Sequence, residues 1–175
     1  TLNNSWSSEY DRIKFIKPDL IKKNNTFFNK VLFQIKNYEI NDYGKLSIIH
    51  GDTVFSNIIK THTNKIKFVD PRGEYSSKAS IHGDMFYDYA KVFQSLNGYH
   101  DIINNKIFNP NNKQIMELVN YYNEYIIEKF GEKKLDIIKV LSSSFYISLI
   151  PFHAQEYQVK FINIAKKIFN SSKFD

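Results

Sequence analysis

The sequence predicts a mainly α-helical α+β domain with one small β-hairpin in its first half. Three observations support this fold class: apolar residues recur at three- and four-residue spacing through most of the chain, two short β-branched runs are joined by a turn, and glycine and proline separate the segments. With 175 residues, of which 42% are hydrophobic, the chain has the size and apolar content of one domain. No linker or shift in composition divides it, so we treat residues 1–175 as a single domain.

Two helices are expected in the N-terminal quarter of the chain. The first spans about residues 8–23 and ends near Pro18 or shortly after it. The second begins at Asn24 or Asn25, because a short amide side chain can cap the first helical turn. Residues 42–44, Asp-Tyr-Gly, end it. Its apolar face consists of Phe27, Phe28, Val31, Leu32 and Ile35.

The predicted β structure follows. A short apolar run at residues 46–49 favours a strand, and residues 57–61 and 65–69 favour two more. The turn at residues 63–65 joins these two strands into a hairpin, and a loop rich in Gly, Ser and Lys is expected over residues 71–81.

Four further helices are expected in the second half of the chain. They span residues 84–96, 113–130, 133–150 and 154–169. Gly98, Gly131 and Pro151 end or separate these helices, and residues 104–112 form a polar loop.

The charge pattern argues against a nucleic-acid-binding protein. The net charge is +6, but the lysines are scattered along the chain and only Arg12 and Arg72 are arginines. Because direct readout of bases depends on the bidentate guanidinium, the sequence is that of a poor DNA reader. We interpret the excess charge as a solvated surface.

Composition also bears on compartment. The chain has no cysteine, which excludes disulfides and thiolate metal sites. Residues 1–6 lack the apolar core of a signal peptide. Residues 137–152 form the most apolar stretch, which we expect to be too short and too polar to span a bilayer. We therefore expect a cytoplasmic protein without a membrane span.

Polar residues cluster around the predicted hairpin. His50, Gly51 and Asp52 precede it, Asn57 opens it, and Asp70 follows its second strand. Carboxylate and amide oxygens suit Mg²⁺, which prefers oxygen ligands. Phosphoryl transfer needs such a metal to neutralise phosphate charge, and a carboxylate to orient the acceptor hydroxyl and take its proton. The spacing H-x-D-x-x-x-x-N, then a hairpin, then Asp, is that of a kinase catalytic loop followed by a metal-binding aspartate.

Three segments carry a resemblance to a known family. Residues 50–57, His-Gly-Asp-Thr-Val-Phe-Ser-Asn, resemble the H-G-D-x-x-x-x-N catalytic loop of aminoglycoside phosphotransferases and choline kinases. Phe68-Val69-Asp70 resembles their metal-binding aspartate, and residues 83–90 resemble their G-D-P-x-Y-D-L-A helix start. The resemblance covers residues 46–98, and the flanking helices match only in type.

The resemblance implies a fold and an activity. The fold would be the C-terminal lobe of a protein-kinase-like fold, with the catalytic loop and metal-binding hairpin in residues 46–73 and a helical substrate subdomain in residues 84–175. The activity would be phosphate transfer from ATP to a hydroxyl of a small molecule, with Mg²⁺ as cofactor.

The resemblance also implies residue roles. Asp52 would be the catalytic base, with His50 bracing its loop. Asn57 and Asp70 would hold Mg²⁺. Asp84 and Asp88 would be structural: they would cap the following helix or tie it to the catalytic loop.

The chain departs from the family pattern in two places. Pro71-Arg72-Gly73 follows the metal-binding aspartate, a form that resembles kinase-like proteins of bacterial surface-polysaccharide pathways. Arg72 could contact the phosphates of the nucleotide or an anionic acceptor, or pair with a surface carboxylate. No Gly-rich phosphate loop precedes His50, so we expect the N-terminal nucleotide-binding lobe to belong to the parent protein, and this chain alone to transfer phosphate poorly and bind Mg²⁺ weakly.

The acceptor stays open between a sugar, choline or another amino alcohol, and an aminoglycoside. Aromatic residues of the later helices could cage a quaternary ammonium, although such residues at helical spacing are more often core. The candidates are Tyr121, Tyr122, Tyr125, Phe145, Tyr146, Phe152, His153, Glu156 and Tyr157.

Two alternative functions are compatible with the sequence. One is a metal-dependent hydrolase, and the other is a non-catalytic kinase-like module that binds a partner or regulates a fused domain. The hydrolase would use His50, Asp52, His62, His82 and Asp84 as ligands of a transition metal.

Overall fold

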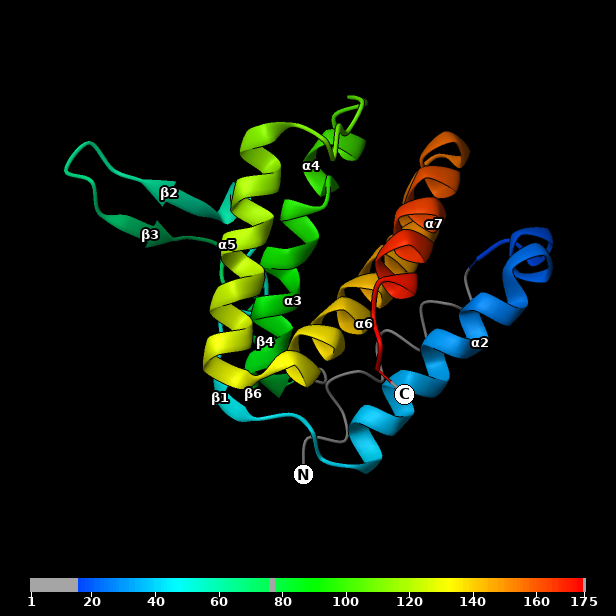
Figure 1. The fold of residues 1–175 in the computed structure, drawn as a ribbon, viewed down its shortest axis with the longest axis horizontal. Helices are drawn as coiled ribbons and strands as arrows, with labels where there is room; N and C mark the ends of the chain where they lie inside the picture. The colour runs from blue at the N-terminus through cyan, green and yellow to red at the C-terminus, as the bar shows by residue number, and fades with distance from the viewer. Residues whose placement is uncertain (1–15, 76–77, 175) are drawn as a thin grey trace.

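A computed structural model describes residues 16–75 and 78–174, and it shows a mainly helical protein with short antiparallel strands (Figure 1). The first half contains α2 (Pro18–Ile40), β1 (Leu46–Ile48), a 3-10 turn (Phe55–Asn57), β2 (Ile58–Lys60), β3 (Ile66–Phe68), β4 (Glu74–Tyr75), β5 (Lys78–Ala79) and β6 (His82–Asp84). The second half contains α3 (Met85–Leu96), α4 (Tyr99–Ile103), α5 (Lys113–Phe130), α6 (Glu132–Leu149), a 3-10 turn (Ile150–Phe152) and α7 (Gln155–Asn170). The predicted α+β class with a small β part is therefore confirmed.

The α2 helix differs from the expectation of two helices. It runs without a break from Pro18 to Ile40, so the predicted end near Pro18 and the predicted cap at Asn24 or Asn25 are wrong. The physical reason is the position of Pro18 in the first turn, where its missing N–H and fixed φ cost nothing. The part of the first expected helix before residue 16 lies outside the described residues.

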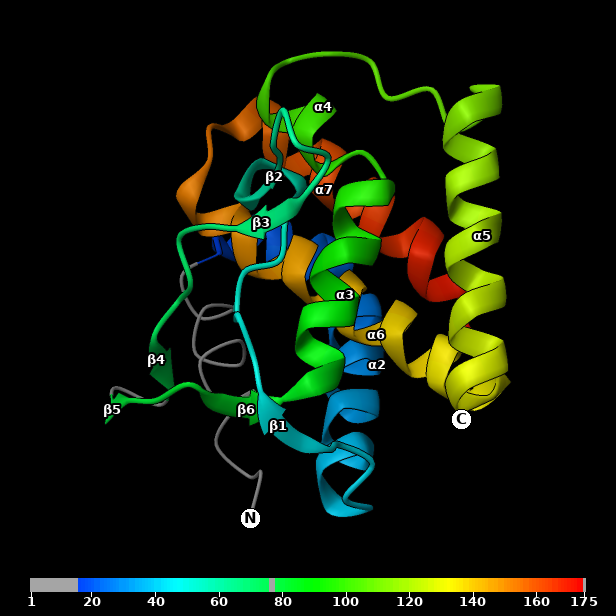
Figure 2. The ribbon, with the colours of Figure 1, turned by 90° about the vertical axis from the view of Figure 1, so that its left-hand side faces the viewer.

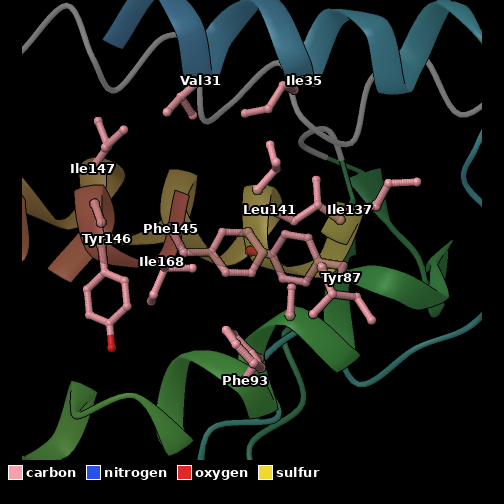
Figure 3. Packing of buried hydrophobic residues seen from close by; sticks show 14 of the residues in the cluster. Val31, Ile35, Tyr87, Phe93, Ile137, Leu141, Phe145, Tyr146, Ile147 and Ile168 are labelled. Atoms are coloured by element: carbon pink, nitrogen blue, oxygen red, sulfur yellow. The ribbon is translucent and has the colours of Figure 1, made fainter. Parts of the chain in front are cut away.

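The α6 helix forms the centre of the molecule and packs against α2, α3, α5 and α7. Figure 3 shows α6 between α2 and α3, with Val31 and Ile35 pointing down onto it from α2. Leu141 and Tyr146 are fully buried on this helix. Most of the buried apolar surface that drives folding is therefore in the helical part.

The burial of α6 also decides how its apolar sequence should be understood. Within the described residues, one segment, Glu132–Phe152, is long and apolar enough by length and composition to cross a membrane, and 72% of its apolar window is buried in the protein. The expectation that residues 137–152 are too short and too polar was therefore too strict. A helix buried in this way is typical of a protein core.

The strands form three separate antiparallel pairs, β1–β6, β2–β3 and β4–β5. The β2–β3 pair is the predicted hairpin, with Ile58 opposite Phe68, and it projects away from the helices (Figure 1). The β1–β6 pair places Leu46 opposite Asp84, and β6 then leads directly into α3 (Figure 2). The strands β4 to β6 and the α4 helix occupy segments for which the sequence predicted only loop or no element.

Candidate functional site

The hairpin returns the chain to the loop that precedes it. The Val69 amide donates to the Asn57 carbonyl at 3.0 Å, and the Arg72 amide donates to the His50 carbonyl at 2.9 Å. Asp70 lies between these two bonds in the sequence. Its backbone is therefore held beside the loop of Asp52 and Asn57, as the sequence predicted.

His50 connects the loop to the end of the hairpin through its side chain. Its Nε2 lies 2.9 Å from the Val69 carbonyl, and its Nδ1 accepts from the Asp52 amide at 3.3 Å. These two contacts are satisfied together by the neutral tautomer with the proton on Nε2. Because both ring nitrogens bind backbone groups, the geometry favours a bracing role for His50 over proton transfer.

Asp88, on the α3 helix, connects that helix to the loop at residues 50–57. Its carboxylate accepts from the His50 amide and from the Gly51 amide, each at 2.8 Å, and its carbonyl accepts from the Thr53 hydroxyl at 2.6 Å. Burial raises the pKa of Asp88, while the two backbone amides lower it in part. The connection that the resemblance implied for Asp88 is present.

Asn57 orients the Asp52 carboxylate. Its Nδ2 donates to the Asp52 carbonyl at 2.9 Å and to Asp52 Oδ2 at 3.0 Å. Both amide hydrogens are thereby directed at Asp52, which leaves the Asn57 Oδ1 for another partner. That oxygen makes only a long contact of 3.5 Å with the Ser56 hydroxyl, so it remains available to a cation.

Asp70 combines an exposed carboxylate with an unusual backbone. Its φ is +57°, a left-handed conformation that an L-residue adopts at a cost of roughly 1–2 kcal/mol. Hydrogen bonds at Val69 and Arg72 hold this conformation in place. The described part of the chain provides no hydrogen bond or ion pair to the Asp70 carboxylate.

Two side-chain oxygens of this region have the chemistry of Mg²⁺ ligands. Asn57 Oδ1 and the Asp70 carboxylate are oxygen donors, and Mg²⁺ sites commonly use one or two such protein ligands together with substrate phosphates and water. A site made by protein alone is not present: in residues 16–75 and 78–174, no three His, Cys, Asp or Glu side chains group closely enough to hold a metal ion.

Lys91 is the main site residue that the sequence did not single out. Its Nζ lies 3.4 Å from Asp52 Oδ1, and its side chain is 16% exposed. The ammonium also lies 4.8 Å from the Phe145 ring centre and 5.7 Å from that of Tyr87. A usable signal was present, because Lys91 follows Asp88 by three residues and thus faces the same side of α3.

The α4 helix borders the same carboxylate. Burial raises the pKa of Tyr99, which the Lys91 charge lowers and the Asp52 charge raises. Burial lowers the pKa of His100, while Asp101 and Asp52 raise it in part. The Phe55 and His100 rings also stack, with their centres 6.3 Å apart, so α4 lies beside the loop of Asp52. The sequence did not predict α4.

The aromatic candidates for the acceptor site do not form one pocket. Tyr122, Phe145 and Tyr146 are buried in the core, whereas Tyr121 and Phe152 are 71% and 66% exposed. The His153 Nδ1 lies 2.8 Å from the Leu149 carbonyl, as in a helix-end histidine. Most of these residues are thus core or surface; of this group, Phe145 contacts Lys91.

The residues of the hydrolase alternative are dispersed. His62 lies in the turn of the hairpin, and His82 is exposed on β6 opposite Ile48. Asp84 is buried, where it caps α3 by accepting from the Phe86 amide at 3.0 Å and binds the Tyr38 hydroxyl. Asp84 is therefore structural, as the resemblance implied.

Comparison with protein-family models, curated proteins and solved structures found no match for this chain.

Proposed function

We propose that this chain is the catalytic part of a phosphotransferase that moves the terminal phosphate of ATP to a hydroxyl of a small molecule. The observation that carries the proposal is the joint placement of Asp52, Asn57 and Asp70. The Asn57 side chain binds Asp52, and backbone hydrogen bonds at Val69 and Arg72 hold the Asp70 backbone beside their loop. The resemblance to aminoglycoside phosphotransferases and choline kinases belongs to the same proposal, as does a fold of the kinase C-terminal-lobe type.

The proposed chemistry assigns one task to each residue. Asp52 accepts the proton of the acceptor hydroxyl while the hydroxyl oxygen forms a bond to the terminal phosphorus of ATP. The bond between this phosphorus and the bridging oxygen breaks, which releases a nucleoside diphosphate. Asn57 holds the Asp52 carboxylate in position through its amide group. Mg²⁺, held by Asn57 and Asp70, would neutralise charge on the phosphates. The Asp52 side chain is 39% exposed, so an acceptor can reach it.

A kinase binds the phosphates of its nucleotide with a Gly-rich loop. The sequence has no Gly-rich phosphate loop, and we propose that a region outside these 175 residues provides it. Within the chain, Ile59 and Val69 are apolar and partly exposed next to Asn57 and Asp70, and they offer a surface for the nucleobase. We place the reaction in the cytoplasm, where ATP is available.

The first test is turnover. In the parent polypeptide, Asp52→Asn should reduce phosphate transfer from ATP to a panel of sugars, amino alcohols and aminoglycosides by roughly 10²–10⁴-fold, because a positioned base is lost. Asp42→Asn is the control, since Asp42 is an exposed aspartate that lies outside residues 46–73. Transfer that persists at the wild-type rate in the Asp52→Asn protein would exclude Asp52 as the base.

The metal site is tested with Asp70→Asn. Asp42→Asn is again the control, since Asp42 is exposed and has a positive φ of 50°, as Asp70 has one of 57°. Mn²⁺ added to ¹⁵N-labelled protein should broaden the amide signals of residues 57 and 70, and Asp70→Asn should remove this effect while Asp42→Asn retains it. Broadening that Asp70→Asn leaves unchanged would assign the ion to another place.

A second candidate is a non-catalytic module that binds a partner. The observation that favours it is the row of exposed apolar side chains on the strands, among them Ile48, Ile66 and Phe68. Such a module needs no acceptor, so it predicts that Asp52→Asn and Asp70→Asn leave its binding to the partner unchanged.

A further inference from the structure

Two cationic side chains meet the same tyrosine ring beside Asp52. The Arg72 guanidinium lies 5.8 Å from the Tyr87 ring centre, and the Lys91 ammonium lies 5.7 Å from it. Arg72 comes from the turn after the hairpin, and Lys91 comes from the α3 helix. The fold thus brings two cations from different elements close to the same tyrosine ring.

The Arg72 side chain is held at both ends. At its base, Arg72 packs so closely on Gly51 that a Cβ added to this glycine would lie 2.8 Å from the Arg72 Cβ. At its tip, one guanidinium nitrogen donates to the Tyr87 hydroxyl at 3.1 Å. The described residues place no carboxylate at ion-pair distance from it, and Arg72 as a whole is exposed.

The Lys91 ammonium is held in a less hydrated place. The Tyr87 and Phe145 rings, whose centres are 4.7 Å apart, lie side by side between α3 and α6 (Figure 3) and cover it from one side. Asp52 lies on another side, at 3.4 Å. Lys91 therefore brings a positive charge to the edge of the Asp52 carboxylate.

We propose that Arg72 and Lys91 form an anion subsite next to Asp52, which binds a phosphate group. Arg72 supplies a bidentate fork that matches phosphate oxygens, and Lys91 supplies a point charge. The phosphate can belong to the nucleotide or to a phosphorylated acceptor. The location beside the base rests on the proposed function, but phosphate binding does not require turnover and is measured separately.

Inorganic phosphate is the probe. Titration into ¹⁵N-labelled protein should shift the Arg72 side-chain N–H signal and the Gly51 amide signal. Arg72→Gln and Lys91→Gln should each weaken phosphate binding by about tenfold or more, as expected for a lost charge-assisted hydrogen bond. Arg72→Lys should recover only part of the affinity, because the charge returns without the fork.

Lys67→Gln is the matched control, because Lys67 is exposed on the nearby β3 strand and the change in net charge is the same. An equal weakening by Lys67→Gln, or an affinity that changes by less than about twofold in both Arg72→Gln and Lys91→Gln, would overturn the subsite. If Lys91→Gln does not fold, Arg72→Gln decides the question, since the Arg72 side chain is exposed.

Asp52→Asn separates this inference from the proposed function. The variant removes the carboxylate that competes for Lys91, so phosphate should bind more tightly while turnover falls. If Asp52→Asn loses turnover but Arg72→Gln and Lys91→Gln bind phosphate as the wild type does, the subsite alone is refuted. Phosphate binding as expected with normal turnover would refute the catalytic base alone. Saturating Mg²⁺ and ADP then identify the source: competition with phosphate assigns the subsite to the nucleotide, and simultaneous binding assigns it to the acceptor.

Discussion

The helical part and the strand-and-loop segment at residues 46–73 are organised by different forces. In the helical part, large side chains such as Leu141 and Phe161 have no exposed surface, and burial of apolar area holds the helices together. In the segment at residues 46–73, apolar side chains such as Ile48 and Ile66 are 68% and 55% exposed. That segment is shaped instead by hydrogen bonds between its own backbone groups and polar side chains.

The two parts meet at α3. One side of this helix buries Phe86, Ala90 and Phe93 in the core, and Asp88 binds the loop at residues 50–57. The difference teaches that the core determines whether the protein folds, whereas a few polar contacts determine where Asp52 lies. Changes in the two parts should therefore be separable by experiment.

The largest expected effect comes from the helical part. Leu141→Ala should lower the free energy of unfolding by about 2–5 kcal/mol, because it leaves a cavity in the fully buried centre of α6. Ile66→Ala on the exposed hairpin should change it by less than about 0.5 kcal/mol. Urea denaturation measures both. Similar losses in the two variants would mean that the hairpin contributes to the core as much as the helices do.

The connection between the two parts is tested by Asp88→Asn. An asparagine oxygen cannot accept from both the His50 and Gly51 amides as a carboxylate does, and an unsatisfied amide costs about 1–3 kcal/mol. Part of this loss is offset, because the buried carboxylate is itself costly. We expect urea denaturation to show a net loss in the free energy of unfolding. Hydrogen exchange at the Gly51 amide should become faster in the variant than in the wild type, by a larger factor than in α6.

The pH dependence of the same variant provides its control. Because burial raises the pKa of Asp88, the folded protein holds this proton more tightly than the unfolded chain. The Asp88 contribution to stability is therefore complete below the ordinary pKa and is lost as pH rises through the raised value. Asp88→Asn should lack this decline. A variant with the same pH dependence as the wild type, or with unchanged exchange at Gly51, would show that Asp88 does not hold the loop.

The sequence predicted most of the helices because their signal is repetitive. The expected helix at residues 113–130 has the same bounds as α5, since Asn112 caps it and Gly131 ends it. The expectation of two helices before residue 42 was wrong because we took Pro18 as the end of a helix, whereas it lies in the first turn of α2. The two-residue strands β4 and β5 and the five-residue α4 were not predicted, because such short elements carry no periodic signal.

The candidate site was predictable where its residues lie close in sequence. Asp52, Asn57 and Asp70 share one loop and hairpin, so local turn geometry brings them together. Lys91 lies on the same side of α3 as Asp88, which is a local signal, but its approach to Asp52 depends on how α3 packs against the loop. The sequence thus indicated the residues of the loop and Asp88, and it did not indicate Lys91 or the α4 helix.

The smallest expected effect concerns the backbone of the loop itself. Gly51 and Gly73 both have a positive φ, +80° and +61°, so replacing either with alanine costs about 1 kcal/mol through the backbone alone. They differ in their surroundings: a Cβ at Gly51 would lie 2.8 Å from the Arg72 Cβ, whereas a Cβ at Gly73 would have only the Pro71 carbonyl oxygen within 4 Å, at 3.9 Å. Gly51→Ala should therefore destabilise the protein more than Gly73→Ala in urea denaturation, and it should also shift the Arg72 side-chain N–H signal. Equal losses with an unmoved Arg72 signal would mean that Arg72 is free to shift, and that the contact between Arg72 and the loop at residues 50–57 is too loose to position it.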